Sequence, residues 1–236
     1  MNLGAIRRAL PGRAIHHYAT LDSTMSAAAG QPLGTVVLAE EQTAGQGRHG
    51  HSWHSEAGTG IYCSMVLKPA PLLTLALGLA TAEAITTATG IACDLRWPND
   101  VLIARKKAAG ILVQLVAGVA IGGVGINVNQ TEFPDELAES ATSLRLQSGR
   151  EFEREPILLA LISAIETYTQ LDPSTVRTLF ARASSYASGR RVKVDQPGGV
   201  VEGVTAGLDP SGYLVVRKDD GTETLILAGG VRAAGS

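Results

Sequence analysis

The sequence predicts an α+β fold in which a mixed, mostly antiparallel sheet with flanking helices is followed by a small all-β unit. Apolar segments with strand character are concentrated between residues 95 and 128. Segment 72–89 is rich in Leu and Ala, and segment 156–171 repeats apolar residues at helical spacing. From Gly189 onward the composition changes to short apolar runs separated by turn residues.

The strands of the larger unit are expected in chain order at 15–19, 35–40, 60–68, 95–96, 101–103, 110–116 and 119–128. Ala117-Gly118 suits a two-residue hairpin turn between the last two strands. The side chains of segment 60–68 alternate in character enough for one face of the strand to point to a site and the other face to a core.

The helices are expected at 23–29, 72–89, 156–171 and 172–187. Asp22 or Ser23 would cap the first of them, because short polar side chains accept hydrogen bonds from the free N–H groups of a first turn. Gly90 would end the second, because glycine readily adopts the left-handed conformation that follows many helices.

The C-terminal unit is expected to contain short strands at 191–194, 200–204, 213–217 and 222–226. Three turn segments rich in Gly and Asp separate these strands, at 198–199, 209–212 and 219–221. This pattern indicates a small β-barrel. The chain is therefore divided into two expected domains, residues 1–187 and residues 188–236.

The composition indicates a globular protein with no general attraction to nucleic acid or to an anionic membrane. The 236 residues are 45% hydrophobic and 18% charged, with a net charge of −2. Cys63 and Cys93 have no spacing partner and apolar neighbours, which favours free core thiols in a reducing compartment. The N-terminus has no signal-like apolar stretch, and the apolar run 72–79 is too short to span a membrane. A cytoplasmic protein is expected.

A glycine-rich segment with one strong cation follows the strand expected at 35–40. It places Gly45, Gly47 and Gly50 around Arg48. Glycine permits positive φ and brings backbone N–H groups close to a ligand, while the arginine guanidinium is a planar charged fork that suits phosphate or carboxylate. The segment predicts an anion-binding loop, although a glycine-rich surface turn is the commoner meaning of such a pattern alone.

A second polar turn, Arg96-Trp-Pro-Asn-Asp100, precedes the strand expected at 101–103. Proline fixes an extended or turned backbone, and Asn99 and Asp100 supply short polar side chains. Alone, this pattern indicates a tight turn with a buried Trp97.

Together, segments 43–53 and 96–100 closely resemble the two signature motifs of biotin protein ligases, G-R-G-R-x-G-R-x-W and K-W-P-N-D. Further matches follow in the order of that family, at 21–25, 42, 62–65, 107–112 and 123–129. The resemblance covers essentially the whole chain, and it depends on the ordered set rather than on any single motif.

The resemblance implies a class II synthetase-like catalytic domain followed by an SH3-like barrel. It implies an enzyme that uses ATP and Mg²⁺ to convert biotin to biotinyl-5′-AMP, and that then transfers biotin to a lysine of the biotin carboxyl carrier protein of acetyl-CoA carboxylase. Family members include monomers and homodimers. The few residues before Asp22 leave no room for the helix-turn-helix domain of some members, so a monofunctional ligase without a nucleic-acid partner is expected.

The resemblance also assigns site residues. Its catalytic groups are Arg48, Arg96 and Lys107. Its biotin-binding positions are Ser23, Thr24, Met25, Gln42, Gly45, Gln46, Gly47, Arg48, Trp53 and Arg96. Its nucleotide-binding positions are Arg48, His49, Trp53, Asn99, Lys107 and Asn127. Segment 130–142 corresponds to the loop that closes over the adenylate, and no protein-held metal is expected.

Four positions depart from the family pattern. Arg96 stands in place of a lysine expected between the biotin carboxylate and the α-phosphate, so a charged fork replaces a point charge. Gln46 and His51 replace arginines, and Met25 replaces an asparagine that many members have. The anion-binding loop therefore carries less charge than the pattern predicts, and Gln46 is expected to contribute mainly through its backbone.

Several alternatives remain open at this stage. Ser23 and Thr24 suit a helix cap, Lys107 suits a solvated basic run, and Arg96 could stack on Trp97 or pair with Asp94 or Asp100. His49, His51 and His54 are spaced so that they could instead bind zinc. For the whole protein, the rivals are a lipoate or octanoate protein ligase of the same fold and a non-catalytic interaction module.

Overall fold

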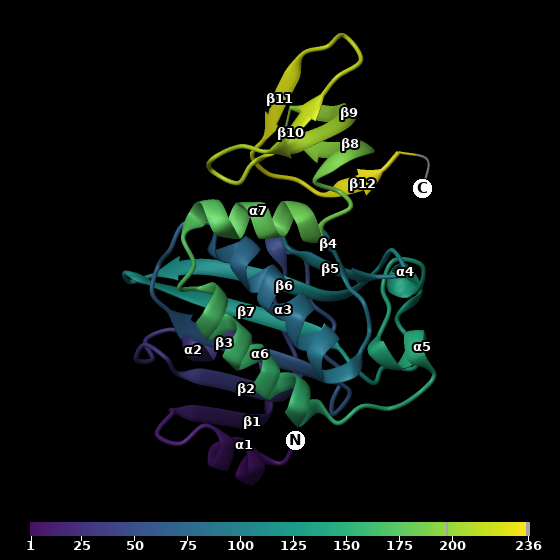
Figure 1. Cartoon of the computed structure of the whole chain (residues 1–236). Helices are drawn as coiled ribbons and strands as arrows, with labels where there is room; N and C mark the ends of the chain where they lie inside the picture. The colour runs from purple at the N-terminus through teal and green to yellow at the C-terminus, as the bar shows by residue number, and fades with distance from the viewer. Residues whose placement is uncertain (197, 235–236) are drawn as a thin grey trace.

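The computed structural model describes residues 1–196 and 198–234, and its larger unit is built on a seven-stranded sheet (Figure 1). The strands are β1 (Ile15–Leu21), β2 (Val36–Gln42), β3 (Gly60–Leu67), β4 (Asp94–Arg96), β5 (Asp100–Ile103), β6 (Lys106–Val116) and β7 (Val119–Asn127). Their order across the sheet is β1-β2-β3-β7-β6-β5-β4. Only β1 and β2 pair in parallel within this described sheet, which confirms the mixed, mostly antiparallel arrangement.

The helices are α1 (Leu3–Ala9), α2 (Thr24–Ala28), the short 3₁₀ helix η1 (Arg48–Gly50), α3 (Leu73–Thr89), α4 (Asp135–Ala138), α5 (Leu144–Ser148), α6 (Arg154–Tyr168) and α7 (Pro173–Ala183). The long helices α3 and α6 pack against each other over one face of the sheet (Figure 1). The short helix α2 packs on β2, β3 and β7.

Adjacent glycines in β7 show that α2 and α3 lie on opposite faces. A side chain at Gly122 would meet Leu77 of α3, whereas one at Gly123 would meet Met25 of α2. Neighbouring residues of a strand point to opposite faces. The face that α3 and α6 leave open is therefore the face that carries α2, and it is available for a site.

The ends of the helices follow from local chemistry. Ser23 caps α2 by accepting a hydrogen bond from the Met25 N–H, and Asp172 caps α7 through the N–H groups of Ser174 and Thr175. Gly90 ends α3 with φ of 77°, as the sequence predicts.

Several predicted boundaries are wrong. Helix α6 ends at Tyr168 rather than at 171, and α7 ends at Ala183 rather than near 187. After α7 the Ser184 hydroxyl donates to the Leu95 carbonyl, and the Ser185 N–H donates to Asp94. These bonds to β4 take the chain out of the helical path.

Strand β6 begins at Lys106, four positions earlier than the predicted start at 110. Ala104 and Arg105 form a tight turn with positive φ, which lets Lys106 pair with Ile103 of β5. The helices α1, α4 and α5 were not predicted, because they are short and present little apolar periodicity. The predicted turn at Ala117-Gly118 is confirmed between β6 and β7.

The C-terminal unit is a five-stranded antiparallel sheet of β8 (Ser188–Gln196), β9 (Gly199–Leu208), β10 (Leu214–Arg217), β11 (Glu223–Ile226) and β12 (Val231–Ala233). Its order is β11-β10-β9-β8-β12, and within the described residues its edge strands β11 and β12 do not pair with each other. A closed SH3-like barrel thus stays a prediction. Residues 197 and 235–236 of the predicted domain lie outside the described residues.

A buried side-chain hydrogen bond connects the larger unit to the C-terminal unit. The indole N–H of Trp97, a side chain that is 4% exposed, donates to the Gly212 carbonyl at 2.9 Å. Across the described part of the chain, none of the helices has the length and apolar character needed to cross a membrane.

Candidate functional site

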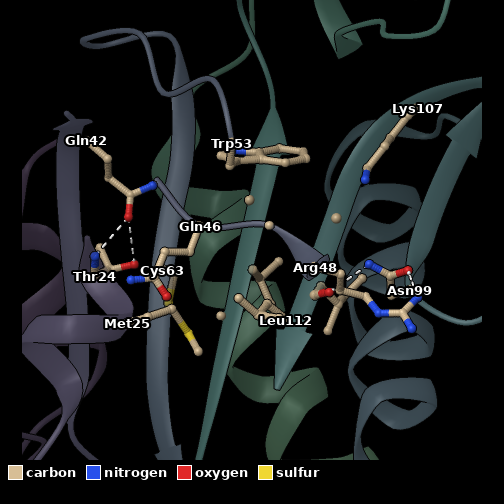
Figure 2. Close-up of a pocket in the computed structure, with 16 residues that line it drawn as sticks. Thr24, Met25, Gln42, Gln46, Arg48, Trp53, Cys63, Asn99, Lys107 and Leu112 are labelled. Carbon is tan, nitrogen blue, oxygen red and sulfur yellow. Dashed lines mark hydrogen bonds between the residues drawn. The ribbon is translucent and has the colours of Figure 1, made fainter. Parts of the chain in front are cut away.

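A narrow pocket with a cavity volume of about 50 Å³ opens on the sheet face that carries α2 (Figure 2). Strands β3, β6 and β7 form its floor, and the glycine-rich segment 43–53 crosses above it. The pocket is lined by Thr24, Met25, Gln42, Gln46, Gly47, Arg48, Trp53, Cys63, Asn99, Lys107, Gly110, Ile111, Leu112, Gly123, Val124 and Gly125.

The floor of this narrow pocket is made of glycines that allow close approach. Gly110 of β6 pairs with Gly125 of β7, and the ring of Trp53 lies against both. A methyl group at Gly110 would meet the Trp53 Cζ3 atom at 2.8 Å. At the other end a methyl group at Gly123 would meet the Met25 sulfur at 2.5 Å. Glycine inside a strand typically marks such an approach.

One end of the narrow pocket holds a network of neutral polar groups. The Gln42 Oε1 atom accepts hydrogen bonds from the N–H of Thr24 at 2.8 Å and from its hydroxyl at 3.1 Å. The Gln42 amide donates to the Ser55 hydroxyl, and the Ser64 hydroxyl donates to that of Thr24. These groups are preorganised donors and acceptors beside the apolar side chains of Met25, Cys63 and Leu112, as in many small-molecule sites.

Backbone bonds close the glycine-rich segment into a compact loop. The Gly47 N–H donates to the His51 carbonyl at 2.7 Å, and the Trp53 N–H donates to the Gly45 carbonyl at 2.8 Å. His49 adopts the left-handed conformation with φ of 56° inside this turn. The loop thereby holds Arg48 and Trp53 on the pocket side.

Arg48 is anchored through the polar turn between β4 and β5. Its Nη1 donates to the Asn99 Oδ1 at 3.2 Å, and the Asn99 amide donates to the Ile111 carbonyl at 2.9 Å (Figure 2). Burial lowers the pKa of the Arg48 guanidinium, and the nearby charge of Asp100 only partly opposes this shift. The guanidinium nonetheless stays protonated at any physiological pH.

A three-membered ion network stands next to Arg48. Asp100 accepts from Arg96 Nη2 at 2.7 Å through Oδ2, and its Oδ1 lies 2.6 Å from Lys107 Nζ. Burial raises the pKa of the Asp100 carboxyl, but the charges of Lys107 and Arg96 outweigh this effect and hold its pKa below the usual value. The Lys107 ammonium also lies 5.2 Å from the centre of the Trp53 ring, a cation–π contact.

A wider pocket with a cavity volume of about 670 Å³ adjoins the narrow one. The two share Gln42, Gly47, Arg48, Trp53, Asn99 and Lys107. The wider pocket is also bounded by residues of segment 133–141 and by Gly229 and Gly230 of the C-terminal unit. Segment 140–142 is tied to β6, since the Lys107 N–H donates to the Ser140 carbonyl and Lys107 accepts from the Thr142 N–H.

Comparison with known proteins identifies the family. Residues 18–130 match the Biotin/lipoate A/B protein ligase family, and residues 187–231 match the Biotin protein ligase C terminal domain. The biotin–[acetyl-CoA-carboxylase] ligase of Mycobacterium tuberculosis is 33% identical over 225 residues, which cover 89% of this chain and 82% of that protein. The chain belongs to the biotin protein ligase family.

Other members of the biotin protein ligase family show the same similarity. The bifunctional ligase/repressor BirA of Bacillus spizizenii is 37% identical over 216 residues, or 84% of this chain. The chain spans 66% of the length of that relative. The biotin protein ligase of Aquifex aeolicus, solved in complex with biotin and ATP, superposes with a TM-score of 0.85 at 31% identity and covers 94% of this chain and 99% of that one.

The structure of this biotin protein ligase family member brings most predicted site residues together. Thr24, Met25, Gln42, Gln46, Gly47, Arg48, Trp53, Asn99 and Lys107 line the narrow pocket, and Gly45, His49 and Asn127 line the wider one. Ser23 and Arg96 line neither. Ser23 is 1% exposed and serves as the α2 cap, and Arg96 is turned toward Asp100.

The Gln46 side chain, which was expected to contribute less than its backbone, donates to the Ser26 hydroxyl and accepts from Gln114, so it braces the loop over the sheet. The zinc alternative has no support, because residues 1–196 and 198–234 contain no cluster of His, Cys, Asp or Glu side chains placed to hold a metal ion.

Sequence reasoning missed the glycine floor and part of the wider pocket. Gly110, Gly123 and Gly125 lie inside predicted strands, and glycine within a strand was the available signal. Cys63 was expected in the core, and it also lines the narrow pocket. Burial raises the pKa of its thiol to about 12, so it acts there as a small apolar group.

Proposed function

We propose that this protein activates biotin with ATP to biotinyl-5′-AMP and then transfers biotin to a lysine of a carrier protein. The observation that carries the proposal is the position of two cations, Arg48 and Lys107, at the junction of the narrow and wide pockets. The carboxylate of a ligand bound in the narrow pocket and a phosphate of a ligand bound in the wide pocket would then meet between these two charges.

The chemistry explains why cations are needed there. A carboxylate oxygen of biotin forms a bond to the α-phosphorus of ATP, and the bond from that phosphorus to the pyrophosphate oxygen breaks. Both reactants are anions, so Arg48 and Lys107 would screen their repulsion and stabilise charge on the phosphoryl oxygens. The amine of the target lysine then attacks the acyl carbon, AMP leaves with the bonding pair, and the amine loses a proton.

The narrow pocket suits the biotin bicycle. An apolar wall of Cys63, Leu112 and Met25 ends at the polar network around Thr24 and Gln42, where a ureido group would find donors and acceptors. The indole N–H of Trp53 is buried and, in the described structure, has no hydrogen-bond partner. A ligand oxygen would satisfy this donor, since an unpaired buried N–H is costly.

The wide pocket is proposed to take ATP. Trp53, His49 and Asn127 line it, and segment 133–141 forms one wall. Asn127 is 4% exposed and donates to the Thr142 carbonyl, so it fixes the far end of that wall. This arrangement supports the role of segment 130–142 as a cover for the adenylate.

Magnesium is proposed to enter with ATP. The site offers the carboxylates of Asp100 and Glu136, of which Asp100 is already paired with two cations. This donor set fits an ion carried mainly by phosphate oxygens and water, which is how Mg²⁺ is commonly bound with nucleotides. When bound, the ion would supply additional positive charge to the phosphates.

The proposed acceptor is the biotin carboxyl carrier protein of acetyl-CoA carboxylase, in line with the names of two relatives.

We further propose that the C-terminal sheet closes as an SH3-like barrel, with Gly229 and Gly230 at the edge of the wide pocket. A homodimer also remains a proposal, and light scattering of the purified protein would decide it.

Biotin-dependent exchange of labelled pyrophosphate into ATP tests the proposed first step. Lipoate and octanoate serve as matched substrates, since the family model covers biotin and lipoate ligases alike. We expect exchange with biotin and at most background with the other two acids. Exchange with lipoate alone would favour the rival ligase, and a folded protein without any exchange would favour a non-catalytic module.

A further inference from the structure

Asp100 is shared by two cations that have different surroundings. Arg96 bonds to Oδ2 through Nε at 3.2 Å and through Nη2 at 2.7 Å, whereas Lys107 approaches Oδ1 at 2.6 Å. The Asp100 side chain is 14% exposed, that of Arg96 is 23% exposed and that of Lys107 is 30% exposed. The carboxylate therefore has one more counterion than its charge requires.

Only one of the two cations lines the pockets that are proposed to hold the reactants. Lys107 lines both pockets and stands over Trp53, whereas Arg96 lines neither pocket. Arg96 is also fixed by the backbone, because it pairs with Asp100 across the β4–β5 hairpin. For Lys107 to contact a carboxylate or a phosphate, its ammonium must move away from Asp100.

The free-energy cost of moving the Lys107 ammonium away from Asp100 depends on Arg96. If Lys107 were the sole partner of Asp100, its departure would leave a nearly buried carboxylate without a counterion, which is strongly unfavourable. With Arg96 in place the carboxylate keeps a charge-assisted bond when Lys107 leaves. A guanidinium is well suited to this role, because it stays charged and offers two donors to one oxygen.

We propose that Arg96 is a positioning residue that serves as the standing counterion of Asp100 and thereby releases the Lys107 ammonium to the reactants. Arg96 itself makes no contact with biotin or ATP in this account. The inference rests on the proposed function, and it replaces the expected direct contact of Arg96 with an action through Asp100.

A double-mutant cycle in the full-length protein tests this assignment. Single-turnover adenylate formation is measured with ATP, Mg²⁺ and biotin for wild type, Arg96→Gln, Asp100→Asn, the double variant and Arg96→Lys. We expect Arg96→Gln to slow adenylation roughly ten- to a hundredfold, because Lys107 is then held by an uncompensated carboxylate. Arg96→Lys should restore most of the rate, because it returns a counterion.

The Asp100→Asn background separates the two roles of Arg96. Without the carboxylate, Lys107 is no longer held, so adding Arg96→Gln should change the rate by less than about threefold. A direct contact of Arg96 with the reactants would still lose at least about tenfold in that background, and this result would overturn the proposal. So would wild-type adenylation by folded Arg96→Gln.

Folding and the proposed function are controlled separately. Melting temperatures show whether each variant is folded, and if Arg96→Gln alone does not fold, the comparison of Asp100→Asn with the double variant still decides the role of Arg96. A wild-type protein that forms no adenylate would refute the proposed function rather than the role of Arg96.

Discussion

The contact of Trp53 with the glycine floor can be tested by adding a single methyl group. In Gly125→Ala the new Cβ would lie 2.8 Å from the Trp53 Cζ2 atom and closer still to two further ring atoms. Ordinary carbon contacts are about 3.5–4.0 Å, so the indole must move by roughly 1 Å. Because the Trp53 backbone is bonded to Gly45, this shift would displace the loop that carries Arg48.

The expected cost follows from overpacking. Such a clash typically costs about 1–3 kcal/mol, which corresponds to biotin binding that is roughly five- to 150-fold weaker if the loop must regain its position in the complex. Titration calorimetry with biotin measures the affinity. Gly78→Ala in α3 is the matched control, because its methyl group would meet Phe180 at an ordinary 3.6 Å and should leave biotin binding unchanged.

A second control uses the ring itself. In a Trp53→Ala background the clash disappears, so Gly125→Ala should have little further effect on biotin affinity. Unchanged biotin affinity for Gly125→Ala in the wild-type background would refute the packing of Trp53 on the floor.

Two predictions concern stability. Trp97→Phe leaves the buried Gly212 carbonyl without its hydrogen-bond donor, so it should lower the free energy of unfolding, measured by urea titration, by about 1–3 kcal/mol. Trp53→Phe is the control: it removes a donor that has no protein partner in the described structure, and it should lower the free energy of unfolding by less. Burial raises the pKa of Glu40, but bonds from the N-terminal ammonium, His17 and Arg154 outweigh it and lower the pKa to about 2. Because the pKa of Glu40 is lower in the folded state than in the unfolded state, ionised Glu40 stabilises the fold by about 1–3 kcal/mol above pH 4.5, and this stabilisation is lost as the pH falls toward 2. Glu40→Gln should therefore lose less stability on acidification than wild type, and equal acid sensitivity of the two proteins would contradict this role.

Much of the sheet could be predicted because its strands carry local signals. The Ala117-Gly118 turn fixed β6 against β7, and Gly90 marked the end of α3. The end of α7 could not be predicted, because it depends on bonds from Ser184 and Ser185 to residues of β4 that are distant in the chain. Such tertiary bonds leave no periodic trace in the sequence.

The candidate site, like the sheet, could be predicted only in part. Arg48 and Lys107 were found because their motifs carry them, and both line the junction of the pockets. The orientation of Arg96 toward Asp100 depends on the β4–β5 pairing, which a motif cannot report. The motif placed a cation in the right region, but the partner of that cation came from the fold.

The most direct test of the account is transfer of biotin to its acceptor. The purified protein is incubated with ATP, Mg²⁺, biotin and a biotin carboxyl carrier domain, and the acceptor is analysed by intact-mass and peptide mass spectrometry. The account predicts one added biotinyl group on a single lysine, dependent on ATP and lost in Lys107→Met. An unmodified carrier in the presence of folded wild-type protein, with several carrier domains tried, would contradict it.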